Sequence, residues 1–138
     1  MKRILIILAL VMGTLQIAEA QTEFRDLSYS QAKRVAKKEH KLLFIDFYST
    51  KCGACKMMDK KVFPQKEVGD FMNEHFVCVK LDTHLGSEGA PYVNRYKIKA
   101  VPTFVIIDPS GWKILYNKAT PNPDGKAFIE MLRQAIGK

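Results

Sequence analysis

The chain has 138 residues, of which 47% are hydrophobic, and its 22 basic and 14 acidic side chains give a net charge of +8. This length allows one compact domain with a substantial core and leaves no room for a second. The lysines are spread without the interleaved aromatic residues of a nucleic-acid platform, and no repeat or low-complexity tract suggests a scaffold. We therefore expect one globular domain without a nucleic-acid partner.

The first twenty residues have the pattern of a secretory signal. Two basic residues, Lys2 and Arg3, precede an apolar stretch from Ile4 to Leu15. Ala18-Glu19-Ala20, with small residues at its first and last positions, then forms a cleavage pattern. An uncleaved membrane anchor is the alternative, but the apolar stretch is shorter than the roughly 20 residues that a spanning helix needs. We therefore expect residues 1–20 to be a cleaved signal peptide.

Cleavage after residue 20 leaves residues 21–138, which are 118 residues with a net charge of +7. The leader has no cysteine for lipid attachment, and the ending Ile136-Gly137-Lys138 is not an endoplasmic-reticulum retention signal. These features predict a bacterial periplasmic protein, with secretion as the second choice.

Hydrophobic periodicity predicts alternating helices and strands along residues 21–138. The expected elements are a helix after the capping-box residues Ser28 and Gln31, a buried strand at 42–48, helices at 55–63 and 67–75, a strand at 76–81, a helix around 92–96, a strand at 103–107, a turn at 108–111, a return strand at 112–116 and a final helix at 128–136. The strand at 76–81 is apolar on both faces except at Lys80, which favours a central position in the sheet. The order of elements predicts an α/β domain with helices on both sheet faces.

The most informative motif is Cys52-Gly53-Ala54-Cys55, between the strand at 42–48 and the helix that follows. At the start of a helix, unpaired N–H groups and the helix dipole stabilise a thiolate, so Cys52 is the expected nucleophile. Cys55 lies three residues further on the same helix face and can attack a mixed disulfide formed at Cys52. The setting favours a redox-active dithiol.

Other functions for the cysteine pair have less support. A zinc site needs a second pair of ligands, and Cys78, His40, His75 and His84 do not have the required spacing. Covalent haem would require histidine at the position of Lys56. A purely structural disulfide stays open, although so short a loop removes little unfolded-state entropy. We expect no metal and no cofactor, and we expect Cys78 to be a core residue.

Three separated motifs resemble those of the thioredoxin family. They are Asp46-Phe47-Tyr48 leading into the cysteine pair, Val79-Lys80-Leu81-Asp82, and the segment from Arg95 to Thr103. The resemblance covers residues 26–136, and it is strongest to the thioredoxin-like C-terminal domain of transmembrane thiol reductases. It implies a thioredoxin-like fold, with a central mixed sheet flanked by helices on both faces, and a thiol–disulfide oxidoreductase activity.

The resemblance also implies roles for residues outside the cysteine pair. Val101-Pro102 is expected to be a cis peptide whose backbone faces the dithiol, so that Val101, Pro102 and Thr103 receive the substrate chain. Asp46 is expected beneath the cysteines as the proton acceptor for Cys55, with Lys80 as its partner. From the residues alone, an acidic side chain inside an apolar strand must be paired or protonated, and burial raises its pKa. A core ion pair without a catalytic role is the alternative.

We therefore expect an exported, monomeric oxidoreductase that reduces the disulfides of exported proteins and receives electrons from a membrane thiol reductase. An oxidase or isomerase would use the same dithiol, and Lys51 and Lys56 beside it favour the thiolate and hence oxidising behaviour. The absence of a histidine between the cysteines acts in the other direction. A non-catalytic binding or copper-delivery module, using the cysteines and His84, is a further alternative.

Overall fold

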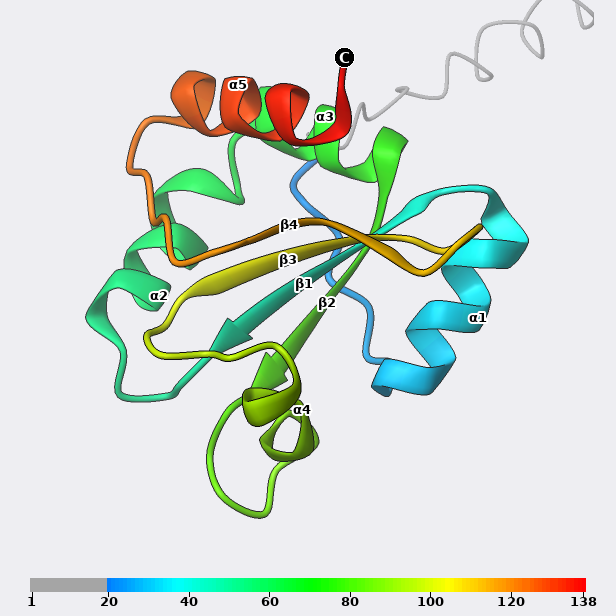
Figure 1. The fold of residues 1–138 in the computed structure, drawn as a ribbon. Coiled ribbons are helices and arrows are strands. Elements are labelled where there is room, and N and C mark those ends of the chain that lie inside the picture. Colours follow the sequence, from blue (N-terminus) through cyan, green and yellow to red (C-terminus); the bar gives the residue numbers. More distant parts are fainter. Residues whose placement is uncertain (1–19) are drawn as a thin grey trace, which may run out of the picture.

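The computed structural model describes residues 20–138, so nearly all of the expected signal peptide lies outside the described residues. A four-stranded sheet lies between helices that cover both of its faces (Figure 1). The elements are α1 (Tyr29–Glu39), β1 (Leu42–Tyr48), α2 (Gly53–Met57), the π-helical η2 (Met58–Val62), α3 (Lys66–His75), β2 (Phe76–Asp82), α4 (Ala90–Arg95), β3 (Thr103–Asp108), β4 (Lys113–Lys118) and α5 (Gly125–Ile136). None of these helices is long and apolar enough to cross a bilayer.

The sheet is mixed, as expected. Its order is β2-β1-β3-β4, with β1 parallel to β2 and antiparallel to β3, and with β3 antiparallel to β4. In an α/β sheet, loops that follow parallel strands meet at one edge. The loops after β1 and β2 therefore lie at the same edge, and the chain enters β3 there as well.

Side chains of β1 alternate between two apolar layers. Leu43, Ile45 and Phe47 pack in the layer beneath α1, whereas Phe44 packs in the layer that η2, α3 and α5 cover. Because successive side chains of a strand point to opposite faces, Asp46 belongs to the same face as Phe44. The alternation of side chains along β1 thus places this carboxyl group on the sheet face that α2 and η2 cover.

The expected central position of β2 is wrong, because β2 is an outer strand of the sheet. Its apolar pattern has a different physical cause. Helices cover both of its faces, and the segment before α1 covers its outer edge, where Phe24 forms a parallel bridge with Cys78. The backbone N–H of Arg25 donates to the Cys78 carbonyl at 2.9 Å. An outer strand that is covered on three sides needs the same apolar residues as a central one.

Several element boundaries differ by a few residues from the sequence expectation, and two of the differences have a clear structural form. The single helix expected at 55–63 begins at Gly53 and changes from α2 to the π-helical η2 at Met58. The return strand begins at Lys113, since Trp112 has a φ of 56° and belongs to the turn. By contrast, the capping box of Ser28 and Gln31 and both ends of β1 are confirmed.

Candidate active site

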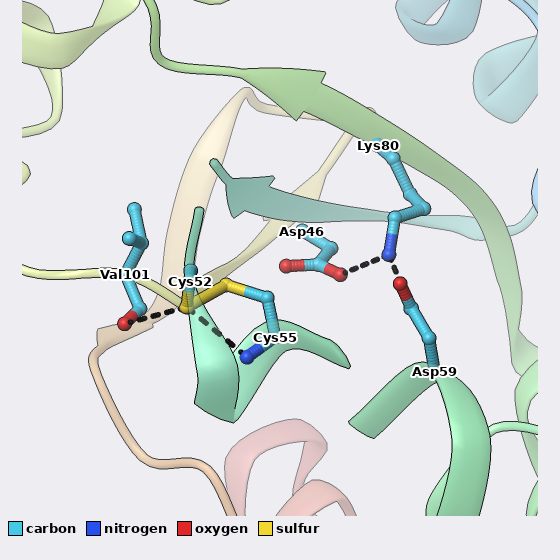
Figure 2. A network of polar contacts seen from close by, with 6 residues as sticks. All are labelled: Asp46, Cys52, Cys55, Asp59, Lys80 and Val101. Atoms are coloured by element: carbon cyan, nitrogen blue, oxygen red, sulfur yellow. Dashed lines mark hydrogen bonds and ion pairs between the residues drawn. A yellow bond between two sulfur atoms is a disulfide. The ribbon is translucent and has the colours of Figure 1, made fainter. Parts of the chain in front are cut away.

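The two cysteines lie where the loop after β1 enters α2, and they are joined as a disulfide (Figure 2). Cys52 is the N-cap residue of α2, and its Sγ accepts a hydrogen bond from the Cys55 backbone N–H at 3.1 Å. The Cα atoms are 5.3 Å apart, a usual separation for a disulfide. Once the pair is reduced, the same N–H group favours the thiolate form of Cys52.

Exposure distinguishes the two sulfur-bearing residues. Cys52 is half-buried, whereas Cys55 is 2% exposed and packs in the interior. An incoming disulfide therefore reaches Cys52 first. Cys55 is buried but bonded to Cys52, so it can react only with a sulfur at Cys52, and its role as the resolving thiol stays a prediction.

The segment before β3 lies against the dithiol. The Sγ of Cys52 is 3.4 Å from the carbonyl oxygen of Val101, and the Val101–Pro102 peptide bond is cis, as the resemblance implies. Val101 is half-buried, whereas Pro102 and Thr103 are buried, and the Thr103 hydroxyl donates to the Ala100 carbonyl at 2.6 Å. Of these three expected substrate-binding residues, Val101 contacts Cys52 directly.

Asp46 is fully buried beneath the dithiol. Its Oδ2 accepts a hydrogen bond from Lys80 Nζ at 3.0 Å, and its Oδ1 has no hydrogen-bond partner among the described residues. Figure 2 shows this second oxygen pointing toward the disulfide. Burial raises the pKa of Asp46 to about 6, although the charge of Lys80 acts to lower it. A carboxyl group with this pKa takes up and releases a proton near neutral pH.

Lys80 faces Asp46 because β1 and β2 pair in parallel with these two residues in register. Its Nζ also lies 5.0 Å from the ring centres of both Phe24 and Tyr48, so aromatic rings cover the ammonium group. Burial lowers the pKa of Lys80, but Asp46 and Asp59 outweigh this effect and raise the pKa above its ordinary value. The ammonium group therefore stays charged and holds the Asp46 side chain in place.

The sequence reasoning missed Asp59 as a member of this network. The Oδ1 of Asp59, on η2, forms a short ion pair with the same Lys80 Nζ that binds Asp46 (Figure 2). Asp59 follows Cys55 by four residues, so helical spacing brings it to the side of the helix that bears Cys55. That spacing is the signal that could have identified it.

The third cysteine is separate from this site. Cys78, on β2, is a free thiol, 1% exposed, in the apolar layer that contains Phe44, and burial raises the pKa of its thiol strongly. The prediction that Cys78 is a core residue is thus confirmed. Within residues 20–138 no three His, Cys, Asp or Glu side chains are grouped so that they could hold a metal ion.

Comparison with known proteins identifies the family. The model of the thioredoxin-like domain matches residues 29–136, which is most of the chain. The chain belongs to the thioredoxin-like family. Family membership, together with a Cys-x-x-Cys pair at bonding distance, supports thiol–disulfide oxidoreductase chemistry at Cys52 and Cys55.

Several relatives share this domain. The chain is 28% identical over 100 residues to the thiol:disulfide interchange protein DsbD of Pseudomonas fluorescens, a match that covers 72% of this chain and 17% of DsbD. The solution structure of a candidate disulphide isomerase from Bacteroides thetaiotaomicron is 33% identical, with a TM-score of 0.74, and the match covers 85% of this chain and 94% of that one. The oxidised DsbD C-terminal domain of Neisseria meningitidis, 20% identical with a TM-score of 0.63 over 77% of this chain and 90% of that one, shares the fold.

The matched segments are only part of the curated relatives. The chain spans 17% of DsbD and 49% and 64% of two matched thioredoxins, from rice and from Drosophila melanogaster.

The raised pKa of Asp46 predicts a pH-dependent loss of stability. The unfolded chain releases the Asp46 proton near pH 3.8, whereas the folded protein holds it until about pH 6. The proton therefore stabilises the folded state at low pH, and this contribution, about 3 kcal/mol, is lost as the pH rises from 4 through 6. Asp46→Asn removes the ionisation. Wild type loses this stability as the pH rises and the variant does not. We therefore expect the free energy of unfolding of Asp46→Asn minus that of wild type to grow by up to this amount from pH 4 to pH 7.

Urea denaturation of the disulfide-bonded proteins at four pH values measures this difference. The matched control is Asp108→Asn, because hydrogen bonds from Ser110 lower the pKa of that exposed carboxyl, so its effect has the opposite sign. A difference between Asp46→Asn and wild type that stays constant from pH 4 to pH 7 would contradict the raised pKa.

Proposed function

We propose that this protein is an exported thiol–disulfide oxidoreductase that reduces disulfides in other exported proteins through Cys52 and Cys55. The observation that supports it most is the unequal exposure of a bonded cysteine pair at the start of a helix, with a half-buried Cys52 over a buried Cys55. Such a pair can open to a dithiol, exchange with a substrate and close again without a change of fold.

The first step is attack by the reduced Cys52 thiolate on one sulfur of the substrate disulfide. The substrate S–S bond breaks, its second sulfur leaves as a thiolate that takes up a proton, and a mixed disulfide joins Cys52 to the substrate. The Cys55 backbone N–H, which bonds to Cys52 Sγ, stabilises the attacking thiolate. The carbonyl of Val101 lies 3.4 Å from this sulfur, so a substrate chain bonded to Cys52 would lie against Val101. Pro102 and Thr103, which follow it, are the other residues of the proposed substrate-binding segment.

In the second step Cys55 loses its proton and attacks the Cys52 sulfur of the mixed disulfide. The bond between Cys52 and the substrate breaks, the reduced substrate leaves, and the Cys52–Cys55 disulfide forms. Two electrons and two protons thus pass to the substrate. Asp46, with an unpartnered oxygen directed at the cysteines, is the proposed acceptor of the Cys55 proton. Lys80 is a positioning residue for that carboxyl group.

Continued turnover needs an external dithiol to return two electrons to Cys52–Cys55. We assign this role to a membrane thiol reductase, and the likeness to DsbD of Pseudomonas fluorescens supports a partner of this class. The basic start, the apolar stretch and the alanines at 18 and 20 support a signal peptide at 1–20 and a periplasmic domain at 21–138, which we propose is monomeric. A mature protein that begins at Gln21 agrees with this proposal, and one that begins at Met1 contradicts it.

Cysteine variants test the catalytic proposal. With dithiothreitol as electron donor, wild-type protein should accelerate insulin reduction, and Cys52→Ser should lose the acceleration because the nucleophile is gone. Cys55→Ser should accumulate a mixed disulfide, since the resolving thiol is missing, and this adduct can be detected by mass spectrometry. Cys78→Ala is the control and should keep full activity, because Cys78 is a buried free thiol that is bonded to neither Cys52 nor Cys55. Equal activity of Cys52→Ser and wild type would contradict the proposal.

The redox potential of Cys52–Cys55 tests the direction of the reaction. A reductase is expected to have a redox potential of about −270 mV, whereas an oxidase would have a redox potential of about −120 mV. Equilibration with glutathione buffers, followed by alkylation of free thiols, measures the value. A potential at the oxidising end would assign the same residues to disulfide formation or isomerisation instead.

A further inference from the structure

Four exposed lysines lie in the two chain segments that meet at the dithiol. Lys51 precedes Cys52, Lys56 follows Cys55, and Lys97 and Lys99 lie four and two residues before Val101, whose carbonyl oxygen contacts the Cys52 sulfur. The segment that leads into β3 and the start of α2 thus lie side by side at this edge of the sheet (Figure 1). We call Lys51, Lys56, Lys97 and Lys99 the basic rim.

The basic rim has no acidic residues in the two segments that form it. Residues 47–58 and 89–107 contain neither aspartate nor glutamate. Among the interactions of residues 20–138, none of the four rim lysines forms an ion pair. The two segments that meet at Cys52 therefore carry exposed positive charge that no ion pair among residues 20–138 offsets.

The carboxyl groups of Asp59, Asp82 and Glu88 have other partners. Asp59 pairs with Lys80, and Asp82 accepts a hydrogen bond from the His84 backbone N–H at 2.9 Å. Glu88 accepts a hydrogen bond from the Tyr29 backbone N–H at 3.1 Å. Tyr29 is the first residue of α1, and α1 covers the sheet face opposite to that of α2. None of these carboxylates contacts a rim lysine.

We propose that the basic rim is a docking surface that selects polypeptide disulfides flanked by acidic residues. This proposal rests on the proposed function, because a ligand of this surface must present a sulfur to Cys52, and disulfide-bearing polypeptides do so. Like charges grouped around a cleft raise the association rate of oppositely charged partners and depress that of similarly charged ones. Exposed charges act through water, so the selection weakens as salt is added.

A second effect of the same lysines has to be separated from docking. Lys51 and Lys56 adjoin the cysteines and favour the Cys52 thiolate, which increases the rate toward every substrate alike. Docking, by contrast, changes the ratio of the reduction rates of substrates that differ in charge. The experiment therefore measures a ratio, and it alters Lys97 and Lys99, which are more distant from the cysteines along the chain.

The test uses three cyclic peptides of equal length, closed by the same cysteine pair and flanked by glutamate, glutamine or lysine. Stopped-flow measurement gives the second-order rate constant for reduction of each peptide by the fully reduced protein at low salt and at 0.5 M NaCl. We expect the glutamate peptide to react about tenfold faster than the lysine peptide at low salt, with the ratio approaching one at high salt.

Lys97→Gln/Lys99→Gln should lower the glutamate-to-lysine ratio at least threefold. The matched control is Lys37→Gln/Lys38→Gln, which removes the same charge from the last turn of α1, away from the dithiol edge, and should keep the ratio. Equal rates for the three peptides, or an equal loss of the ratio in the control, would overturn the docking surface while leaving the proposed function intact. If the wild type reduced none of the peptides, the proposed function would fail and the docking surface with it.

Discussion

The ion pair between Asp46 and Lys80 is the interaction on which the dithiol region depends. Asp46 interrupts an otherwise apolar β1, where an unpaired charge would cost several kcal/mol. The parallel register of β1 and β2 places Lys80 directly across from it, and strand alternation puts both side chains on the face of α2 and η2. A register shift of one residue would turn one partner to the opposite face. If Asp46 accepts the Cys55 proton as we propose, the register of the sheet and the redox chemistry are coupled.

The charges at this edge of the sheet act at two ranges. In the buried network, the Lys80 ammonium group binds the carboxyl groups of both Asp46 and Asp59. When Asp46 is protonated, the charges of Lys80 and Asp59 cancel and the network is neutral. Outside, the lysines of the basic rim act through water on whatever approaches Cys52. In our account the buried network controls proton transfer at Cys55, and the exposed charge controls which partner arrives.

Much of this organisation could be predicted from the sequence, because the local signals agree with one another. The limits of β1, the α1 capping box and the buried Cys78 follow from apolar runs and capping residues alone. The position of β2 could not be predicted in this way, since the residues around Phe24 cover its edge, and a covered edge has the apolar pattern of a central strand. Asp59 was missed because its pairing with Lys80 depends on how η2 sits over the sheet, which hydrophobic periodicity does not report.

The rate at which Cys55 resolves a mixed disulfide at Cys52 reports whether Asp46 accepts the Cys55 proton. A chromogenic aryl thiol bonded to Cys52 reports its own release in a stopped-flow instrument from pH 5 to pH 9. We expect Asp46→Asn to resolve the mixed disulfide at least about tenfold more slowly than wild type near pH 7, and to approach the wild-type rate at high pH, where Cys55 ionises without help. Superimposable pH profiles for the two proteins would contradict this role of Asp46.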